Sequence, residues 1–519
     1  MIAKRNQHFK LTGAVLACAV ISACSSDSPD SSLNSGTASS GTADVSEFVS
    51  IGDSLTAGYA DGALYLLGQT NSFPNILAQQ FADADGVAVD FEQPLAQTDL
   101  GGFLVAGMTG VLENRFVLDA DTQTPERLAG DPTEEVIGSG LNGMTFNNMG
   151  VPGAKSFHLG AVGYGDPGPG PGTFLGVSSS PYFARFALDQ VTSSVVADAA
   201  AQQPSFYTMW IGNNDVLSFA TSGGIGVDQL GNADITGAID PANEYGSNDI
   251  TDPTAFAGVY AGLVGAMTAA NPAVQGVLIN IPDVSTIPFF TTVPFNPVPL
   301  DQATADQLNA GYDATYNAGL VAAQGLSLIT ADEVARRTIA FSEGQNAVVF
   351  TDDEGLTDLS ATAVPLPSIR HATANDLVVL PTSSIIGVEA ILGDPTTTQG
   401  VGQALEDGDV LSEAELQLIE TARTAFNATI KAAADADPNL AFFDAAAAMA
   451  ELQASGIDFK TGSISSDFAT GGAFSLDGVH PTGRGYAVLA NGIIDVINAA
   501  FAANVHKVDP AAFPTIFLK

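Results

Sequence analysis

One serine in the chain has a setting suited to nucleophilic chemistry. Ser54 lies in residues 51–55, which follow a short apolar run typical of a buried strand and precede a helical stretch. At the open end of a parallel sheet, the hydroxyl of such a serine is exposed to substrate. A serine hydroxyl is a weak nucleophile until a base removes its proton, so this position requires a histidine from elsewhere in the chain.

Among the five histidines, His480 is the best placed to be that base. It lies in a loop before the last expected helix, and Asp477 stands three residues upstream. One turn can present both groups, so that Asp477 accepts from Nδ1–H while Nε2 faces the serine. The sequence therefore predicts a triad of Ser54, His480 and Asp477, and we interpret His158 and His371 as structural residues.

Other hydrolytic layouts lack their motifs. The chain contains no Gly-x-Ser-x-Gly and no His-Glu-x-x-His, and both cysteines, Cys18 and Cys24, lie near the N-terminus. The predicted chemistry needs no metal and no organic cofactor. Acidic loops such as 240–252 could hold calcium, but their spacing matches no EF-hand, so we assign no metal.

Short apolar runs alternate with longer helical patterns. The candidate strands are 48–51, 144–148, 206–211, 274–281 and 440–444, and the candidate helices are 254–270, 302–324, 412–436 and 484–503. Ser412, with Glu415 three residues later, gives the third helix a capping box. This alternation predicts an α/β fold with helices on both faces of a parallel sheet. Two stretches, 163–181 and 329–409, fit the scheme poorly and are expected to be long loop insertions.

Four blocks of the sequence together resemble the GDSL (SGNH) hydrolase family. The blocks are 48–57 with Ser54 as the nucleophile, 148–154, the Gly-x-Asn-Asp of 212–215, and the Asp-x-x-His of 477–480. All four occur in the family's order, each near an expected strand end or loop. The combination is far more specific than any single block.

The resemblance implies one three-layer α/β/α domain of flavodoxin-like architecture, with a central parallel five-stranded sheet and long loop insertions. It also implies an oxyanion hole made by the backbone N–H groups of Ser54 and Gly153 and the side-chain amide of Asn214. Gly150 is an alternative to Gly153. Fixed donors aimed at a tetrahedral intermediate lower the barrier by about 3 kcal/mol each.

The implied reaction is hydrolysis of carboxylic esters with a short to medium acyl chain through an acyl-enzyme on Ser54, so the expected partner is a small-molecule or lipid ester. Alternatives are removal of O-acetyl groups from a polysaccharide, cleavage of lysophospholipids or thioesters, and a non-catalytic surface lipoprotein that keeps the fold. The apolar run 286–295 either lines an acyl pocket or packs a loop.

The N-terminus has the pattern of an export signal. Three basic residues among the first ten precede an apolar stretch, 11–23, which is shorter than the roughly 20 residues of a membrane-spanning helix. Residues 21–24 resemble a bacterial lipobox with Cys24 as the lipidated residue; an ordinary signal peptide cut near residue 23 is the alternative. Ser25 replaces the aspartate typical of inner-membrane retention, so we expect a cell-envelope lipoprotein in the outer membrane of a Gram-negative bacterium.

The expected organisation is a signal peptide over 1–23, a flexible Ser- and Gly-rich tether over 24–44, and a hydrolase domain over 45–519 with its insertion at about 329–409. The formal net charge of −41 makes nucleic acid a poor partner. Contact with a membrane is expected only through the N-terminal lipid.

Overall fold

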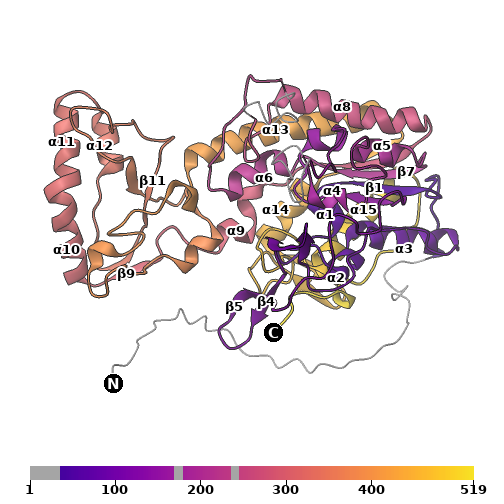
Figure 1. The fold of residues 1–519 in the computed structure, drawn as a ribbon, viewed down its shortest axis with the longest axis horizontal. Coiled ribbons are helices and arrows are strands. Elements are labelled where there is room, and N and C mark those ends of the chain that lie inside the picture. The colour runs from indigo at the N-terminus through magenta and orange to yellow at the C-terminus, as the bar shows by residue number, and fades with distance from the viewer. Residues whose placement is uncertain (1–35, 169–178, 235–244) are drawn as a thin grey trace.

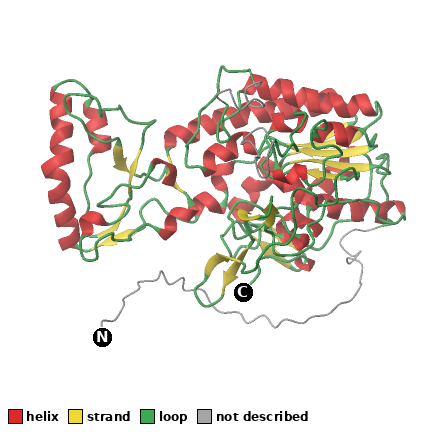
Figure 2. Ribbon diagram, in the orientation of Figure 1, coloured by secondary structure: helices red, strands yellow, loops and turns green. Residues whose placement is uncertain are grey.

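The computed structural model describes residues 36–168, 179–234 and 245–519. Its centre is an all-parallel sheet of five strands in the order β6-β1-β7-β8-β15 (Figure 1, Figure 2). These strands are β1 (Phe48–Gly52), β6 (Asn148–Gly150), β7 (Phe206–Trp210), β8 (Gln275–Ile279) and β15 (Leu440–Phe443). By position along the chain the order is 2-1-3-4-5, the flavodoxin-like arrangement. The expected α/β fold with a five-stranded parallel sheet is confirmed.

The central strands are continuous apolar runs because both of their faces are covered. Every residue of β1 and of β7 is buried. Ile51 pairs with Met149 on one side and with Met209 on the other. The expected strand 144–148 is wrong in its bounds, since β6 begins at Asn148. The backbone N–H groups of Asn147 and Asn148 both donate to the carbonyl of Glu92 in a loop, which leaves only three residues to pair with β1.

Helices form a layer on each face of the sheet. One layer consists of α3 (Phe73–Asp85) and α15 (Gly483–Ala500), whose apolar residues pack with Phe206 and Val277. The other consists of α5 (Val195–Ala200), α8 (Pro253–Ala270) and α13 (Glu413–Ala436), which pack with Met209 and Leu278. Met209 and Leu278 therefore face one layer, and Phe206 and Val277 face the other.

Two of these helices carry features visible in the sequence. Ser412 caps α13 as expected, because its hydroxyl accepts the N–H of Glu415 and its own N–H donates to Oε2 of Glu415. Helix α8 is long and apolar enough, by length and composition, to cross a membrane. In this structure it lies over the sheet, in contact with α5 and α13 (Figure 1).

Shorter elements fill the loops of the body. The helices are α1 (Ser54–Ala57), α2 (Leu66–Thr70), α4 (Pro181–Ala184), α6 (Asn214–Thr221), α9 (Pro288–Thr291) and α14 (Ala445–Ser455). The paired strands are β2 (Phe103–Val105) with β3 (Met108–Leu112), β4 (Phe116–Asp119) with β5 (Thr124–Arg127), β13 (Leu377–Val378) with β14 (Val410–Leu411), and β16 (Ile457–Phe459) with β17 (Gly462–Ile464).

A separate lobe projects from the body (Figure 1). It contains α10 (Gln302–Tyr312), a π-helical turn (Asp313–Asn317), α11 (Ala318–Gly325), α12 (Ala331–Arg337), and the strand pairs β9 (Val298–Leu300) with β10 (Gly344–Asn346) and β11 (Val349–Thr351) with β12 (Ile369–His371). It has its own apolar core, with members from Val293 to Val410. The insertion thus begins well before residue 329. The expected helix 302–324 exists but packs in the lobe, because periodicity identifies an apolar face without naming the core it joins.

The N-terminal side of the domain also starts earlier than expected. Ser39 exchanges two backbone hydrogen bonds with Asn504, and the N–H of Thr42 donates to the carbonyl of Phe501. Ala43 is buried in the core with α15. Residues 36–44 therefore pack on the body instead of forming part of a tether. The signal peptide, Cys24 and the rest of the expected tether lie outside the described residues, as does most of the stretch 163–181.

Candidate active site

Ser54 is held at the carboxyl end of β1 by the start of a short helix. Asp53 is the N-cap of α1: its Oδ1 accepts the N–H of Leu55 at 3.0 Å, and its Oδ2 accepts from the amide of Asn213 at 2.9 Å. Burial raises the pKa of Asp53 to about 6, although both hydrogen bonds act to lower it. Gly58, at φ +80°, ends the helix after a single turn. This strand-to-helix turn sets the serine at the edge of the sheet where sites of parallel folds lie.

The structure brings together the three residues of the predicted triad, although 426 positions separate the serine from the histidine. Nε2 of His480 lies 2.9 Å from Oγ of Ser54, and Nδ1 of His480 lies 2.9 Å from Oδ2 of Asp477. The carboxylate can only accept when ionised, so Nδ1 carries the proton and Nε2 is free to accept from the serine. A base in this tautomer can deprotonate the serine.

Asp477 is fixed by several donors. Its Oδ1 accepts the N–H groups of Val479 and His480 at 2.8 and 2.9 Å, and the hydroxyl of Ser475 at 3.0 Å. Its Oδ2 accepts the N–H of Gly62 at 2.8 Å. Burial raises the pKa of Asp477, but the neighbouring His480 and these hydrogen bonds outweigh burial and lower it to about 2. The carboxylate therefore stays ionised and can stabilise an imidazolium.

The structure separates the two glycines that the sequence left as alternatives. The N–H of Gly150 donates to Oδ1 of Asn148, and a Cβ at Gly150 would lie 2.2 Å from the backbone nitrogen of Ala57. Gly150 is thus a close-packing position between β6 and α1. Gly153 is exposed at φ +79°, and its N–H meets no acceptor among the described residues. A free N–H on an exposed loop can bind a substrate oxygen.

Asn214 is held next to the same loop. It is the first residue of α6, and its Nδ2 donates one hydrogen bond, of 2.9 Å, to the carbonyl of Ala154. The second N–H of that amide meets no acceptor among the residues that the structure describes, so it can bind a substrate oxygen. Gly153 follows β6 and Asn214 follows β7, and these strands flank β1 on its two sides. Ser54 therefore stands between the two predicted oxyanion donors.

Buried polar residues behind this loop were not identified from the sequence. Asp215 accepts both the N–H and the hydroxyl of Ser156, at 2.8 and 2.7 Å, and so joins the third sequence block to the segment just after the second. Lys155 is buried and donates to the carbonyl of Asp249; burial lowers its pKa to about 8. Of these contacts, the sequence offered only one sign: Asp215 ends the Gly-x-Asn-Asp block.

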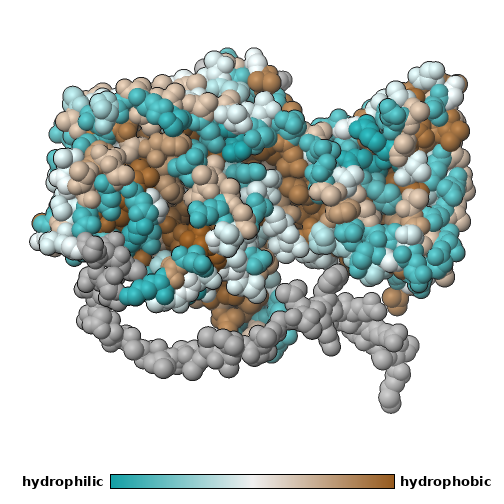
Figure 3. Space-filling view, turned by 180° about the vertical axis from the view of Figure 1, so that it is seen from behind, coloured by the Kyte–Doolittle hydropathy of each residue, from teal (hydrophilic) through white to brown (hydrophobic). Residues whose placement is uncertain are grey.

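Aromatic rings lie beside His480, and α9 and the lobe contact the loop that carries it. The ring of Tyr59 lies 4.7 Å from the imidazole, and Tyr182 meets Tyr59 edge-on. The N–H of Phe289, in α9, donates to the carbonyl of Gly478 within the catalytic loop, and a Cβ at Gly478 would lie 3.1 Å from the side chain of Leu380. Figure 3 shows apolar surface gathered where the lobe meets the body. No sequence motif marked Tyr59, Tyr182 or Leu380.

The apolar run 286–295 packs in the main core and beside the catalytic loop; its role as an acyl pocket stays a prediction. Phe290 is buried in the main core, whereas Phe289 is only half-buried beside the catalytic loop. His158 is stacked on Tyr164 and accepts the N–H of Lys155, and His371 lies in the lobe with its Nε2 at 3.1 Å from the backbone of Ala340. These placements agree with structural roles for both histidines.

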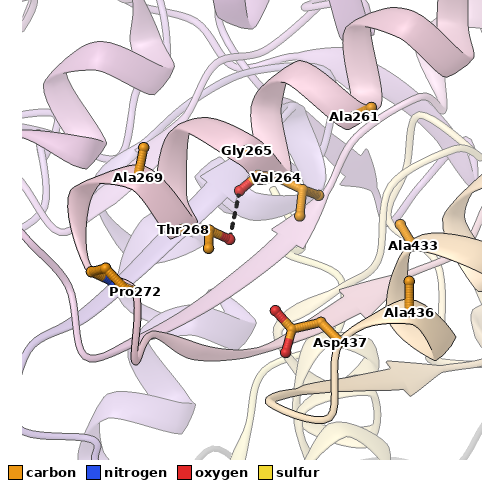
Figure 4. A pocket seen from close by; sticks show the side chains of 9 residues that line it. All are labelled: Ala261, Val264, Gly265, Thr268, Ala269, Pro272, Ala433, Ala436 and Asp437. Carbon is orange, nitrogen blue, oxygen red and sulfur yellow. Dashed lines mark hydrogen bonds between the residues drawn. The ribbon is translucent and has the colours of Figure 1, made fainter.

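Two other features lie apart from the triad. An open apolar groove between α8 and α13 is lined by Ala261, Val264, Gly265, Thr268, Ala269, Pro272, Ala433, Ala436 and Asp437 (Figure 4). Within the described part of the chain, Glu354, Asp407 and Glu415 each bring one carboxylate oxygen within 4.8 Å of the others. Neither set includes a residue of the triad or of the oxyanion loop.

A flavodoxin-like sheet with a serine, a histidine and an aspartate in hydrogen-bonded series at its carboxyl edge defines the SGNH class of hydrolytic folds. The GDSL-like Lipase/Acylhydrolase family model matches residues 48–349, and the chain belongs to this family. It is therefore a hydrolase of ester or acyl bonds in the general sense of that family. Comparisons with curated proteins and with solved structures gave no match. The matched range contains Ser54 and ends before Asp477 and His480, which the fold brings back to the serine.

Proposed function

We propose that the protein hydrolyses carboxylic esters of short to medium acyl chain through an acyl-enzyme on Ser54. The observation that supports this most directly is the unbroken series from Oγ of Ser54 through His480 to Asp477, with both distances at 2.9 Å. The general chemistry of the family agrees with it.

In the first half of the proposed reaction, Nε2 of His480 takes the serine proton as Oγ attacks the ester carbonyl. Asp477 stabilises the resulting imidazolium. The N–H groups of Ser54 and Gly153 and the amide of Asn214 bind the oxyanion. His480 then protonates the leaving alcohol, and the acyl group remains on Ser54.

In the second half, a water molecule takes the place of the alcohol. His480 deprotonates this water as it attacks the acyl carbonyl, the same donors bind the second oxyanion, and the proton returns to Oγ of Ser54 as the acid leaves. These residues carry both halves without a metal or an organic cofactor.

The surroundings of the serine favour a compact acyl group. Ser54 is only 6% exposed, the ring of Tyr59 lies beside His480, and Tyr182 packs edge-on against Tyr59. A nucleophile with so little access to solvent leaves little room for a bulky acyl group. Short and medium chains are therefore the first substrates to test.

The test compares hydrolysis of p-nitrophenyl acetate, butyrate and octanoate by the wild-type protein and by Ser54→Ala. Hydrolysis that depends on Ser54 and declines from butyrate to octanoate is expected. Acetylated xylan provides the comparison for an O-acetylesterase. A strong preference for the glycan would replace the proposed substrate class, and hydrolysis that persists in Ser54→Ala would contradict the serine mechanism.

A further inference from the structure

A buried carboxylate, Asp61, lies behind the triad and takes no part in the chemistry proposed above. It is 1% exposed and has φ +52°, a left-handed conformation that aspartate tolerates better than most residues. Its Oδ2 accepts the hydroxyl of Tyr65 at 2.7 Å, and its carbonyl accepts the N–H of Phe116 at 2.7 Å. The turn at Asp61 is therefore held from two sides.

Three hydrogen bonds join this turn to the loop that carries the acid of the triad. Oδ1 of Asp61 accepts the N–H of Leu476 at 3.0 Å, and the N–H of Asp61 donates to Oγ of Ser475 at 2.8 Å. The N–H of Gly62 donates directly to Oδ2 of Asp477 at 2.8 Å. The links meet three consecutive residues, 475 to 477.

Ser475 connects the N–H of Asp61 to the carboxylate of Asp477 and so restricts the orientation of that carboxylate. Its hydroxyl oxygen accepts from Asp61, and its proton points to Oδ1 of Asp477 at 3.0 Å. A hydroxyl with one fixed donor cannot rotate freely, so it presents its proton in a defined direction. Each oxygen of Asp477 thus accepts a hydrogen bond from a donor that the turn 61–62 holds in place. Of the two oxygens, Oδ2 is the one that faces Nδ1 of His480.

We propose that Asp61 is a positioning residue whose carboxylate, bonded to Leu476 and Tyr65, fixes the turn 61–62 against the catalytic loop. The backbone N–H groups of that turn, through Ser475 and directly, then orient the carboxylate of Asp477 toward His480. The proposal rests on the proposed function, because it assigns Asp61 a role through the acid of that triad. If Asp61 only joined two loops, its removal would lower kcat by the same factor whether or not Asp477 were present. A positioning residue loses its effect on turnover once Asp477 is removed, and this difference can be measured.

The first experiment measures kcat and KM for p-nitrophenyl butyrate with the purified full chain. The variants are Ser475→Ala and Asp61→Gly; glycine is used because alanine is strained at φ +52°. Misorientation of the acid is expected to lower kcat on the order of 10- to 100-fold. KM is expected to change by less than about twofold, since no substrate contact is removed. Asp61→Asn, which keeps an acceptor for the N–H of Leu476, should restore most of the kcat.

A double-mutant cycle then separates positioning from general structural support. Ser475→Ala and Asp61→Gly are repeated in an Asp477→Ala background, where no further loss of kcat is expected. An equal fold-loss in both backgrounds overturns the proposal, as does wild-type kcat in both folded single variants. Asp198→Ala is the control: Asp198 is a buried carboxylate that accepts the N–H of Leu188 away from the triad, and its loss should leave kcat unchanged. If Asp61→Gly does not fold, Ser475→Ala decides.

A proton NMR measurement tests the same proposal without a substrate. The Nδ1 proton of His480, held against Asp477 at 2.9 Å, should give a strongly deshielded resonance in the wild type and in Asp198→Ala. It should be lost or broadened in Ser475→Ala and Asp61→Gly. An unchanged resonance in both folded variants rejects the positioning role. The proposed function fails by a different result: the wild type would then show no more hydrolysis than Ser54→Ala.

Discussion

At the scale of residues, the site combines a fixed base with donors placed on both sides of the nucleophile. His480 is held between Ser54 and the carboxylate of Asp477, whose pKa is lowered to about 2, so this carboxylate stays ionised at the pH of ordinary assays. Gly153 and Asn214 come from loops after the two strands that flank β1. Donors fixed before the reaction need no reorganisation when the oxyanion forms.

Asn214→Ala is expected to lower kcat by about 100-fold, because one oxyanion donor contributes roughly 3 kcal/mol to the transition state. KM should change little, since the charge on the oxygen develops only after binding. Steady-state kinetics on p-nitrophenyl butyrate measure both values. Asn271→Ala is the matched control. Asn271 lies at the end of α8, and its amide donates to the carbonyl of Pro204. The kcat of this variant should equal that of the wild type. An unchanged kcat in folded Asn214→Ala would contradict the oxyanion role.

The sequence predicted the triad and the candidate donors because short motifs carry them. Asp477 and His480 lie three residues apart, and the Gly-Asp-Ser-Leu of 52–55 follows an evident strand. Tyr59, Asp61 and Ser475 could not be identified in this way. Their roles depend on loops far apart in sequence that meet only in the folded chain.

At the scale of elements, the turn from β1 into α1 positions Ser54, and a capping box begins α13. Strands β1, β7, β8 and β15 were predictable because each is a short, mostly apolar run. β6 was misplaced because part of its backbone bonds to a loop. In the lobe, α10 and α11 were predicted as one helix over 302–324, whereas α12 lies in the stretch expected to be a loop. The core that α10 and α11 join was not predicted, since an apolar face has the same period in either core.

The cap of α13 gives a prediction about stability and pH. Burial, together with the nearby charges of Glu354 and Asp407, raises the pKa of Glu415 from 4.5 to about 8, although hydrogen bonds from Ser412 act to lower it. The folded protein therefore holds this proton more tightly than the unfolded chain. The resulting stability is fully present below pH 4.5 and is lost as the pH rises through 8.

Glu415→Gln is expected to remove this loss. Glutamine keeps an acceptor for the N–H of Ser412 and carries no charge. At pH 9 the free energy of unfolding of the variant should exceed that of the wild type by on the order of 1–3 kcal/mol, measured by urea unfolding at pH 6 and pH 9 with a chelator present. Glu413→Gln, an exposed neighbour in the same helix, should follow the wild type. If the free energy of unfolding changed equally with pH in the wild type and in Glu415→Gln, Glu415 would not hold a proton in the folded state.

At the scale of the whole molecule, the chain consists of a sheet domain and a lobe that contacts the catalytic loop. Leu380 of the lobe and Phe289 of α9 both lie against Gly478, two residues from His480. The described chain begins by packing residues 36–44 on α15. Any N-terminal anchor would therefore join the body next to the end of that helix.

We propose that Cys24 carries a lipid that attaches the protein to the cell envelope, on the basis of the lipobox-like residues 21–24. Cells that express the protein should incorporate radioactive palmitate into it, and the label should disappear in Cys24→Ala. Cys18→Ala is the control and should keep the label, because Cys18 lies within the segment removed on processing. Unlabelled wild-type protein would leave an ordinary signal peptide as the explanation.

The most direct measurement of the central claim is covalent labelling of the nucleophile. The purified protein is treated with a fluorophosphonate, which reacts with serines activated by a neighbouring base, and the modified peptide is mapped by mass spectrometry. We expect a single adduct on Ser54, absent from Ser54→Ala and strongly reduced in His480→Ala. An adduct on another serine, or equal labelling of Ser54 when His480 is removed, would contradict the central claim.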